Sequence, residues 1–173
     1  IVERYAPKRT LDVGCAKGFL VEHLRDCGVE AFGIDASEYA ISQVREDVKP
    51  YCKVASATEP YDGRFDLITC IEVAEHLTEE EGRKLVDRIC AHTDQVIFSS
   101  TPSDFDEESH FNVRPAEHWK SLFAARGFHT DLHFEPGIVT PHALRFRRAP
   151  ARPIRVAVFS NEEEKHAVVK LRL

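Results

Sequence analysis

The feature that most constrains this chain is a glycine-containing turn, TLDVGCAKG at residues 10–18, which stands between an apolar run and an amphipathic segment. The apolar residues before the turn predict a β-strand, and those after it recur at helical spacing. The next apolar run, EAFGID at residues 30–35, predicts a second strand that ends in an acid. A strand, a turn, a helix and a strand in this order predict the first βαβ unit of a doubly wound α/β domain.

The turn and the acid together indicate a nucleoside-type ligand. Gly14 and Gly18 leave room for a ligand near the backbone, and the helix start behind them offers unpaired N–H groups that suit a carboxylate. Asp35 can accept hydrogen bonds from both hydroxyls of a ribose. A generic βαβ turn and a dinucleotide site are the alternatives. A dinucleotide fingerprint needs G-x-G-x-x-G, whereas Cys15 and Ala16 follow Gly14 here.

The pattern D-x-G-x-x-x-G within LDVGCAKG resembles motif I of the class I S-adenosylmethionine (SAM)-dependent methyltransferases, and the resemblance runs from about residue 2 to residue 149. It implies an α/β fold with a Rossmann-like seven-stranded, mostly parallel sheet, helices on both faces and a terminal antiparallel hairpin. It also implies SAM as the cofactor. Relatives often place an acid near the adenine, but Ser56 stands there in this chain. The residues expected to bind SAM are Asp12, Gly14, Cys15, Ala16, Gly18, Phe19, Asp35, Ala36, Ser56, Ala57 and Ile71.

Composition places the chain among ordinary globular proteins, with 173 residues, 43% hydrophobic residues and a formal net charge of −6. No apolar run approaches the roughly 20 residues that span a bilayer, and no signal peptide opens the chain. The 5 cysteines form no C-x-x-C pair, which favours buried thiols in a reducing cytoplasm. Because the chain has no methionine, we expect that the natural protein begins upstream.

The remaining elements follow from periodicity and capping signals. Thr78 and Glu81 form a capping box before a long amphipathic helix, and Pro115 is well placed at a helix start. The acidic stretch between residues 101 and 113 predicts a long loop. The predicted elements are a helix capped by Ser37 and running to residue 48, strands at 52–56, 65–71 and 95–99, and a hairpin of strands at 128–134 and 142–148.

The end of the chain departs from this pattern. APARP at 149–153 predicts a linker, IRVAVF at 154–159 predicts a new strand, and a short helix is expected to follow. This tail resembles the start of a glycosyltransferase's nucleotide-sugar domain; an appendage packed on the same domain is the alternative. We therefore expect a methyltransferase domain at 1–149 and, at 150–173, a linker plus a strand and helix that begin a further domain or form an appendage.

A cluster of acids and histidines is expected where the fourth and fifth strands end. Glu72, Glu75 and His76 have the spacing i, i+3, i+4, so one helical turn would place them on one face, and His110 can approach from the next loop. Such a mixture of oxygen and nitrogen ligands suits Mg²⁺ or Mn²⁺. The E-x-x-E-H string resembles a metal motif of ubiquinone-pathway O-methyltransferases and of small-RNA 2′-O-methyltransferases, and the latter also supply a histidine after strand five.

The alternative to a metal site is an acid–histidine pair without any ion. In that case Glu75 is solvated and His76 only orders the loop, or His76 or His110 is the catalytic general base that removes a hydroxyl proton. The other histidines, at 23, 92, 129, 133, 142 and 166, show no ligand-like clustering.

These observations predict a SAM-dependent O-methyltransferase that acts on a small hydroxyl acceptor such as a sugar or glycan end. The preference for a sugar rests on the tail, which also suggests fusion to a glycosyltransferase domain. The alternatives are an RNA 2′-O-methyltransferase and a SAM-binding module without activity. The acidic residues at 104–108 and the absence of a Lys/Arg cluster near the site count against nucleic acid.

Overall fold

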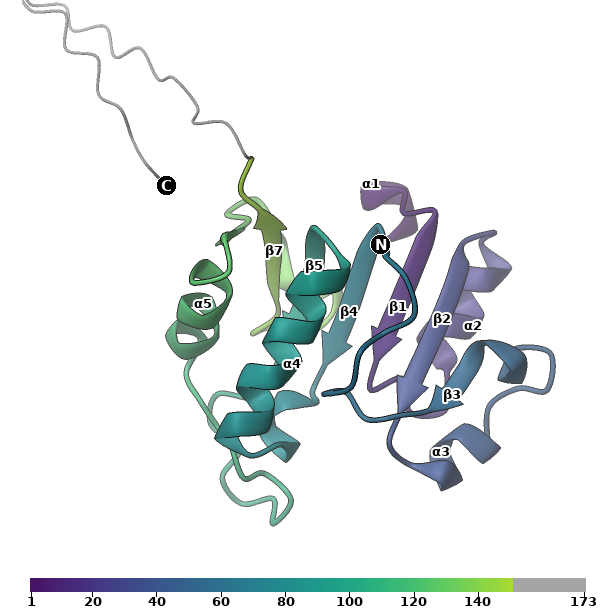
Figure 1. The fold of residues 1–173 in the computed structure, drawn as a ribbon, viewed down its shortest axis with the longest axis horizontal. Coiled ribbons are helices and arrows are strands. Elements are labelled where there is room, and N and C mark those ends of the chain that lie inside the picture. Colours follow the sequence, from purple (N-terminus) through teal and green to yellow (C-terminus); the bar gives the residue numbers. More distant parts are fainter. Residues whose placement is uncertain (151–173) are drawn as a thin grey trace, which may run out of the picture.

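The computed structural model describes residues 1–150, in which seven strands form one sheet (Figure 1). The strand order is β3-β2-β1-β4-β5-β7-β6. The first five strands in this order run parallel, whereas β7 runs antiparallel to both β5 and β6. The expected mostly parallel sheet with a terminal antiparallel pair is confirmed. The strands are β1 (Arg9–Val13), β2 (Glu30–Asp35), β3 (Cys52–Val54), β4 (Leu67–Ile71), β5 (Gln95–Ser99), β6 (Phe128–Thr130) and β7 (Leu144–Arg148).

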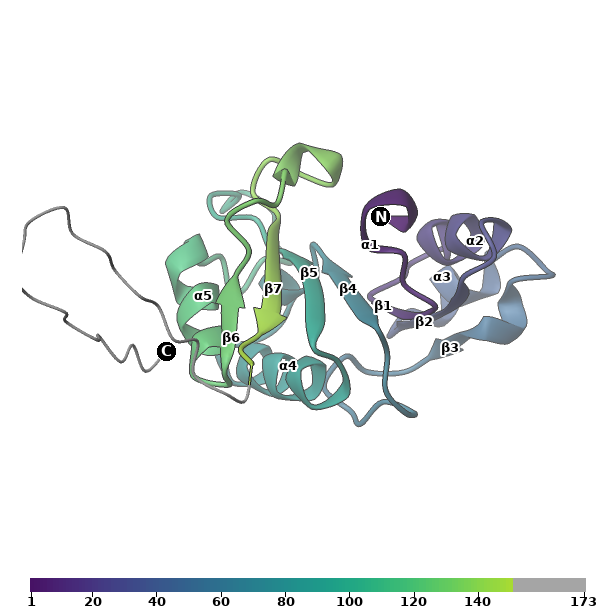
Figure 2. The same cartoon turned by 90° about the horizontal axis from the view of Figure 1, so that it is seen from above.

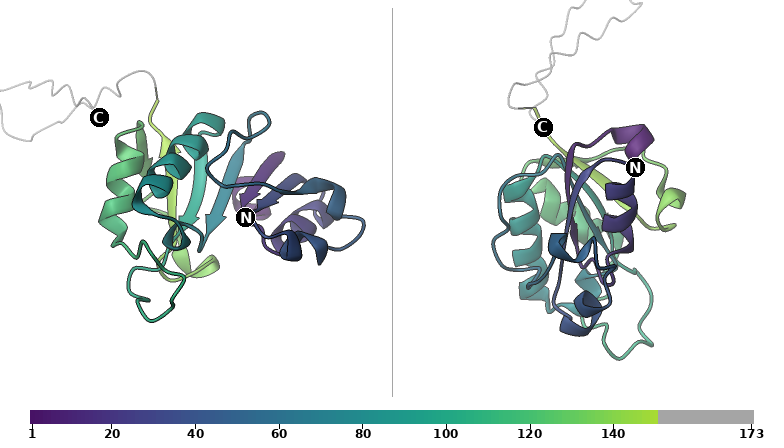
Figure 3. Two further views of the ribbon diagram at one scale, coloured as in Figure 1. Left: turned by 60° about the horizontal axis from the view of Figure 1, so that its bottom comes forward. Right: turned by 90° about the vertical axis from the view of Figure 1, so that its right-hand side faces the viewer.

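Helices cover both faces of the sheet, as predicted (Figures 2 and 3). Helices α4 and α5 pack on one face, and α1, α2 and α3 lie on the other. None of the helices in residues 1–150 is long and apolar enough to cross a membrane. The helices are α1 (Val2–Tyr5), α2 (Phe19–Asp26), α3 (Glu38–Ser42), α4 (Glu79–His92) and α5 (Ala116–Ala124), with short 3₁₀ turns η1 (Lys49–Tyr51), η2 (Ala74–His76) and η3 (Pro136–Ile138).

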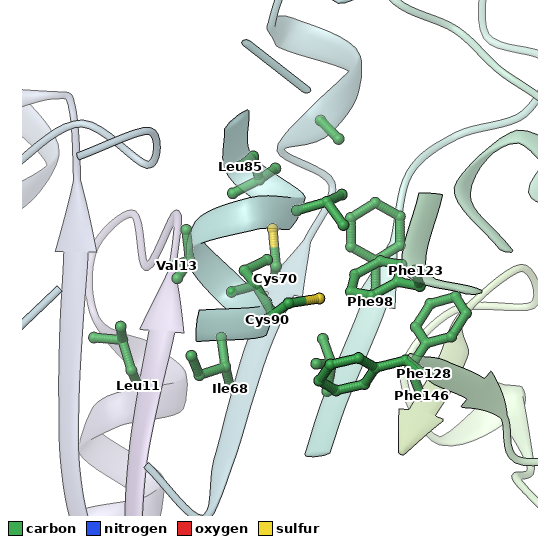
Figure 4. Close-up of a cluster of buried hydrophobic side chains, with 14 of the residues drawn as sticks. Leu11, Val13, Ile68, Cys70, Leu85, Cys90, Phe98, Phe123, Phe128 and Phe146 are labelled. Atoms are coloured by element: carbon green, nitrogen blue, oxygen red, sulfur yellow. The ribbon is translucent and has the colours of Figure 1, made fainter. Parts of the chain in front are cut away.

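The larger part of the core lies between the sheet and helices α4 and α5 (Figure 4). Its centre is aromatic: the rings of Phe123 and Phe146 stack with centroids 4.0 Å apart, and Phe98 contacts both of them and Trp119. Aromatic pairs of this kind contribute beyond the area that they bury. This cluster holds the antiparallel strand β7 beside β5, and so places the loop before β7 near the carboxyl ends of the parallel strands.

The helix signals that depend on short spacing are confirmed. The Thr78 hydroxyl accepts the Glu81 N–H, and the Glu81 carboxylate accepts the Thr78 N–H, so the capping box is complete at the start of α4. The Ser37 hydroxyl caps α3 by accepting the Ala40 N–H. Both contacts satisfy backbone donors that a helix start leaves free.

The strands expected at 52–56, 65–71 and 142–148 are each two residues shorter than predicted, and two further elements are much shorter. The helix from residue 37 to residue 48 was wrong in length, because α3 ends at Ser42 although Val44 and Val48 are buried as predicted. Turns bury Val44 and Val48 there, and Arg45 forms ion pairs with Glu22 and Asp26 of α2 as well as with Asp47 of its own segment. Strand β6 ends at Thr130 because the Asp131 side chain accepts the His133 N–H in a local turn.

The expectations for residues 150–173 lie almost entirely outside the described residues. The linker, the strand at 154–159 and the following helix therefore stay predictions, as does the division of the chain into two domains.

The sheet has one edge at which a ligand site is expected. Strands β1, β2, β4 and β5 all end at this edge, the lower one in Figure 1. The chain passes from β1 to β2 on one side of β1 and returns to β4 on the other. In open α/β sheets, ligands bind beyond the carboxyl ends of the strands at such a switch point.

Candidate active site

The glycine turn after β1 is tied to the end of β2 by backbone and carboxylate contacts. The Ile34 carbonyl accepts the N–H groups of Gly14 and Cys15, at 2.8 Å and 3.0 Å. One oxygen of Asp35 accepts the Ala16 N–H at 2.8 Å, and the other accepts the Ser37 N–H at 2.8 Å. Each carboxylate oxygen keeps a further lone pair. Asp35 therefore shapes the turn and can still accept a ligand hydroxyl.

Backbone conformation and packing inside the protein explain why residues 14 and 18 are glycines. Gly14 and Gly18 have φ angles of 78° and 74°, a left-handed backbone that favours glycine. A Cβ atom on Gly14 would lie 2.2 Å from a methyl group of Val73, and one on Gly18 would lie 3.2 Å from Val44 and 3.3 Å from the Cys52 sulfur. The space that we expected these glycines to leave for a ligand is thus occupied by side chains of the protein.

The other residues expected at SAM come from the ends of the same strands. The Ala55 N–H donates to the Asp35 carbonyl at 2.9 Å, which brings the segment after β3 beside the end of β2. Ser56 and Ala57 are half-buried in this segment, and Ile71, half-buried too, ends β4. Phe19, the first residue of α2, and Ala36, which directly follows β2, are exposed, whereas Cys15 is buried. The predicted set therefore surrounds the edge where β1, β2, β3 and β4 end.

Asp12 is a buried acid within β1. Its side chain accepts the Thr69 hydroxyl at 2.6 Å and is 6% exposed. Burial raises the pKa of Asp12 to about 6, the Thr69 hydrogen bond opposes this shift, and the nearby Asp35 carboxylate adds to it. A buried carboxylate that is ionised at neutral pH destabilises the fold. The ionised Asp12 carboxylate therefore lowers the stability of the fold at neutral pH.

We expect Asp12→Asn to stabilise the chain at neutral pH. A folded-state pKa raised from 3.8 to about 6 means that wild-type stability falls as the pH rises through this window, whereas an amide does not titrate. The variant should gain up to about 3 kcal/mol in the free energy of unfolding at pH 7.5. Urea unfolding at pH 7.5 and pH 4.5 measures this gain, which should shrink strongly at the lower pH. An equal difference at both pH values would contradict the assignment.

The second group of predicted residues lies where β4 and β5 end. Glu75, His76 and His110 each offer one ligand atom, and these atoms lie within 4.8 Å of one another. The rings of His76 and His110 are in edge contact, with centroids 4.7 Å apart. The structure thus brings together three of the four expected metal ligands. The expected single α-helical turn is wrong: Glu75 and His76 lie in η2, and Glu72 precedes it with a left-handed φ of 54°.

Glu75 is the most unusual side chain of this group. It is 1% exposed, and neither carboxylate oxygen has a hydrogen-bond partner among residues 1–150. Burial raises the pKa of Glu75, and the neighbouring Glu72 carboxylate raises it further. The alternative in which Glu75 is solvated is therefore wrong. A buried carboxylate without a partner costs free energy unless a cation or a proton compensates it.

The two imidazoles are oriented by contacts at their Nδ1 atoms. His76 Nδ1 lies 3.3 Å from the Ser109 carbonyl oxygen, and His110 Nδ1 lies 3.0 Å from the Asp104 carbonyl oxygen. A carbonyl only accepts, so the contact of His110 assigns its proton to Nδ1 and leaves a lone pair on Nε2. His76 Nδ1 also lies 3.2 Å from the Ser109 hydroxyl, which can donate or accept. An imidazole fixed in this way is the usual arrangement of a metal ligand or of a general base.

Sequence analysis missed His142, which we did not expect to cluster with any ligand. Its Nε2 lies 2.8 Å from Glu72 Oε1, and the Ser99 hydroxyl donates to the same oxygen. Burial raises the pKa of Glu72, but these two hydrogen bonds, the charge of His142 and a contact with Glu75 together hold the pKa below its ordinary value. Since 70 residues separate the pair in the sequence, no local spacing signal reports this contact.

The strand order, the switch point and the tied glycine turn define a class: a Rossmann-like α/β domain of the kind that binds a nucleoside cofactor. Residues 2–133 match the family described as a methyltransferase domain. The chain belongs to this family, and its fold is that of the class I SAM-dependent methyltransferases.

Individual relatives agree with this assignment. The chain is 33% identical over 141 residues to the ubiquinone biosynthesis O-methyltransferase of Aromatoleum aromaticum, covering 75% of this chain and 58% of that protein. The magnesium protoporphyrin IX methyltransferase of Synechocystis PCC 6803, solved with bound SAH, has a TM-score of 0.66 at 18% identity, covering 81% of this chain and 74% of that one. A small RNA methyltransferase has a TM-score of 0.64 at 19% identity, and the match covers 84% of this chain and 23% of that protein. At 18% and 19% identity, these two solved structures show that the fold is shared and nothing more. The chain matches only part of such relatives: 58% of the length of the Aromatoleum aromaticum enzyme and 35% of that of the ubiquinone biosynthesis O-methyltransferase of Methylococcus capsulatus.

Proposed function

We propose that this chain is the catalytic domain of a SAM-dependent O-methyltransferase that methylates a hydroxyl group of a small acceptor with the help of a divalent cation, Mg²⁺ or Mn²⁺. The observation that carries the proposal is the buried carboxylate of Glu75, which has no hydrogen-bond partner among residues 1–150 and lies beside two imidazoles at the same sheet edge as the glycine turn. Similarity to proteins named as O-methyltransferases supports the oxygen preference.

The residues at this end of the sheet fit both SAM and a divalent cation. Asp35 would accept the ribose hydroxyls of SAM, and the N–H groups at the start of α2 would face its carboxylate. Glu75, His76 and His110 would hold the cation, whose charge would compensate the orphaned carboxylate. Bound SAM supplies an activated methyl group, and a bound divalent cation lowers the pKa of a coordinated hydroxyl.

The contribution of the protein is mainly alignment. Methyl transfer is an in-line displacement, so the rate depends on holding the acceptor oxygen opposite the departing sulfur and on excluding water. The cluster at the ends of β4 and β5 lies one strand away from the turn after β1. If no cation is bound, Nε2 of His76 or His110 accepts the hydroxyl proton instead.

The class of acceptor is the finer part of the proposal. A sugar or glycan end was expected from the tail at residues 150–173, of which the structure describes only residue 150, so a hydroxyl-bearing small molecule is the broader proposal. A protein related in fold acts on small RNA, but the acidic residues at 104–108 flank the site here and disfavour a polyanion. A module that binds SAM without turnover is the remaining alternative.

One assay separates these functions. Purified chain is incubated with SAM and Mn²⁺ and, in turn, with a phenol, a polyol, a sugar, a primary amine and a short RNA, and formation of S-adenosylhomocysteine is measured. We expect turnover with at least one hydroxyl compound and none with the amine. Tight SAM binding without turnover on any acceptor would favour the non-catalytic module, and turnover only on RNA would favour 2′-O-methylation.

A further inference from the structure

His142 owes its place at the site to the antiparallel strand. In the register of β5 and β7, Phe98 pairs with Leu144, so the start of β7 lies beside the end of β5. His142 is two residues before Leu144 and therefore reaches the edge at which β4 and β5 end. The side chain is 30% exposed, and its Nε2 lies 2.8 Å from Glu72 Oε1.

Glu72 is held from several sides. Its N–H donates to the Ser99 carbonyl oxygen at 3.1 Å, with the Ser99 hydroxyl oxygen also in range at 3.2 Å. Its Oε1 accepts from both the Ser99 hydroxyl and His142 Nε2. A non-glycine residue with a left-handed φ of 54° persists where surrounding contacts over-determine it. Glu72 is therefore fixed in both backbone and side chain.

The second oxygen of Glu72 is left free. Among residues 1–150, no N–H or O–H group donates to Oε2, whereas Oε1 has two donors. Glu72 directly follows β4, and η2, which holds Glu75 and His76 of the cluster, begins two residues after it. One anchored oxygen and one free oxygen, beside a cluster of three ligand atoms, is the arrangement of a carboxylate prepared to bind a cation.

The two imidazoles of the cluster are likewise anchored through one atom. His76 and His110 each contact the loop after β5 through Nδ1, and among residues 1–150 neither Nε2 atom has a hydrogen-bond partner. Outer contacts of this kind orient ligands, and their loss typically lowers metal affinity by roughly 10–100-fold. For Glu72, the outer contacts are Ser99 and His142.

We propose that His142 is a positioning residue that, together with Ser99, anchors Oε1 of Glu72 and thereby presents Oε2 as the fourth ligand to a divalent cation held by Glu75, His76 and His110. This inference rests on the metal site of the proposed function and adds a residue that supports the cation without touching it. The cation is bound by two acids and two histidines, and a third histidine acts through Glu72.

Calorimetric titration of the full chain with MnCl₂ tests the proposal. We expect His142→Ala to weaken Mn²⁺ binding by roughly 10–100-fold. His142→Gln should retain affinity within a few-fold, because a glutamine amide also donates a hydrogen bond. SAM affinity should be unchanged in both variants, which shows that the fold is intact. His129→Ala is the matched control, because His129 is exposed on β6 and should leave Mn²⁺ affinity at the wild-type value.

A double-mutant cycle shows whether the effect passes through Glu72. In a Glu72→Ala background, His142→Ala should cause no further loss of Mn²⁺ affinity, because the residue that it positions is gone. Wild-type affinity in His142→Ala, or tighter binding, would overturn the proposal and leave the three-ligand site standing. If the wild-type chain itself binds no Mn²⁺, the metal site of the proposed function fails, and the role of His142 fails with it.

Discussion

Asp35→Ala is expected to weaken SAM binding by at least about 100-fold. A hydrogen bond to a charged group contributes about 1.5–3 kcal/mol, and Asp35 would make two of them to the ribose. The same side chain accepts the N–H groups of Ala16 and Ser37, so its loss also loosens the glycine turn that must face the cofactor. Calorimetry with SAM measures the change directly.

Asp66→Ala is a matched control for this experiment. Asp66 also accepts two backbone N–H groups, those of Lys8 and Arg9, both at 2.9 Å, but it does so at the opposite edge of the sheet. The two variants lose similar internal contacts, so they should lose similar thermal stability, while only Asp35→Ala loses SAM. Undiminished SAM affinity in Asp35→Ala would remove the basis for placing the ribose at the end of β2.

Glu75→Gln is expected to abolish cation binding and activity while stabilising the metal-free chain. An amide has nearly the same shape as the carboxyl group, but it carries no charge into a site that is 1% exposed. The melting temperature without metal should therefore rise, whereas Mn²⁺ affinity should fall by at least about 100-fold, since a charged ligand is lost. Removal of metal from the wild-type chain by EDTA should mimic the loss of activity and leave SAM bound.

The control for Glu75→Gln is Glu80→Gln, which changes the same functional group on the exposed surface of α4. Within the described residues Glu80 pairs only with Lys84, at the surface, and such a pair contributes little to stability. Neither Mn²⁺ affinity nor turnover should change. If Glu75→Gln and wild-type enzyme in EDTA both methylate their acceptor at full rate, the cation has no role, and His76 or His110 takes the part of the general base.

Contacts between near neighbours in the chain were predictable from the sequence. The capping box of Thr78 and Glu81 needs only the spacing of three residues, because the helix start itself brings the two side chains together. The glycine turn is also local, and Asp35 reaches it because a βαβ unit has one handedness and one geometry. The buried apolar residues of β4 and α4 followed from periodicity in the same way.

Hydrophobic spacing was a less reliable guide to helix length in the segment after Ser42, because turns bury the same side chains. Val44 and Val48 are inward, as their spacing predicts, but the chain between them forms turns instead of a helix. Hydrophobic periodicity reports which side chains are buried and not which backbone groups are hydrogen-bonded. The ion pairs of Arg45 with Glu22 and Asp26 of α2 show that this segment is held by its neighbour.

The sequence by itself therefore determined the fold class, the glycine turn with its acid, and the acids and histidines at the ends of β4 and β5. Only the tertiary structure decided how those groups are used. Among residues 1–150 it buries Glu75 without a hydrogen-bond partner, ties one oxygen of Glu72 to Ser99, and brings His142 to the same oxygen from across 70 residues. The physical reason is that an antiparallel strand beside β5 returns the chain to the site, and its register is set by packing of the aromatic core.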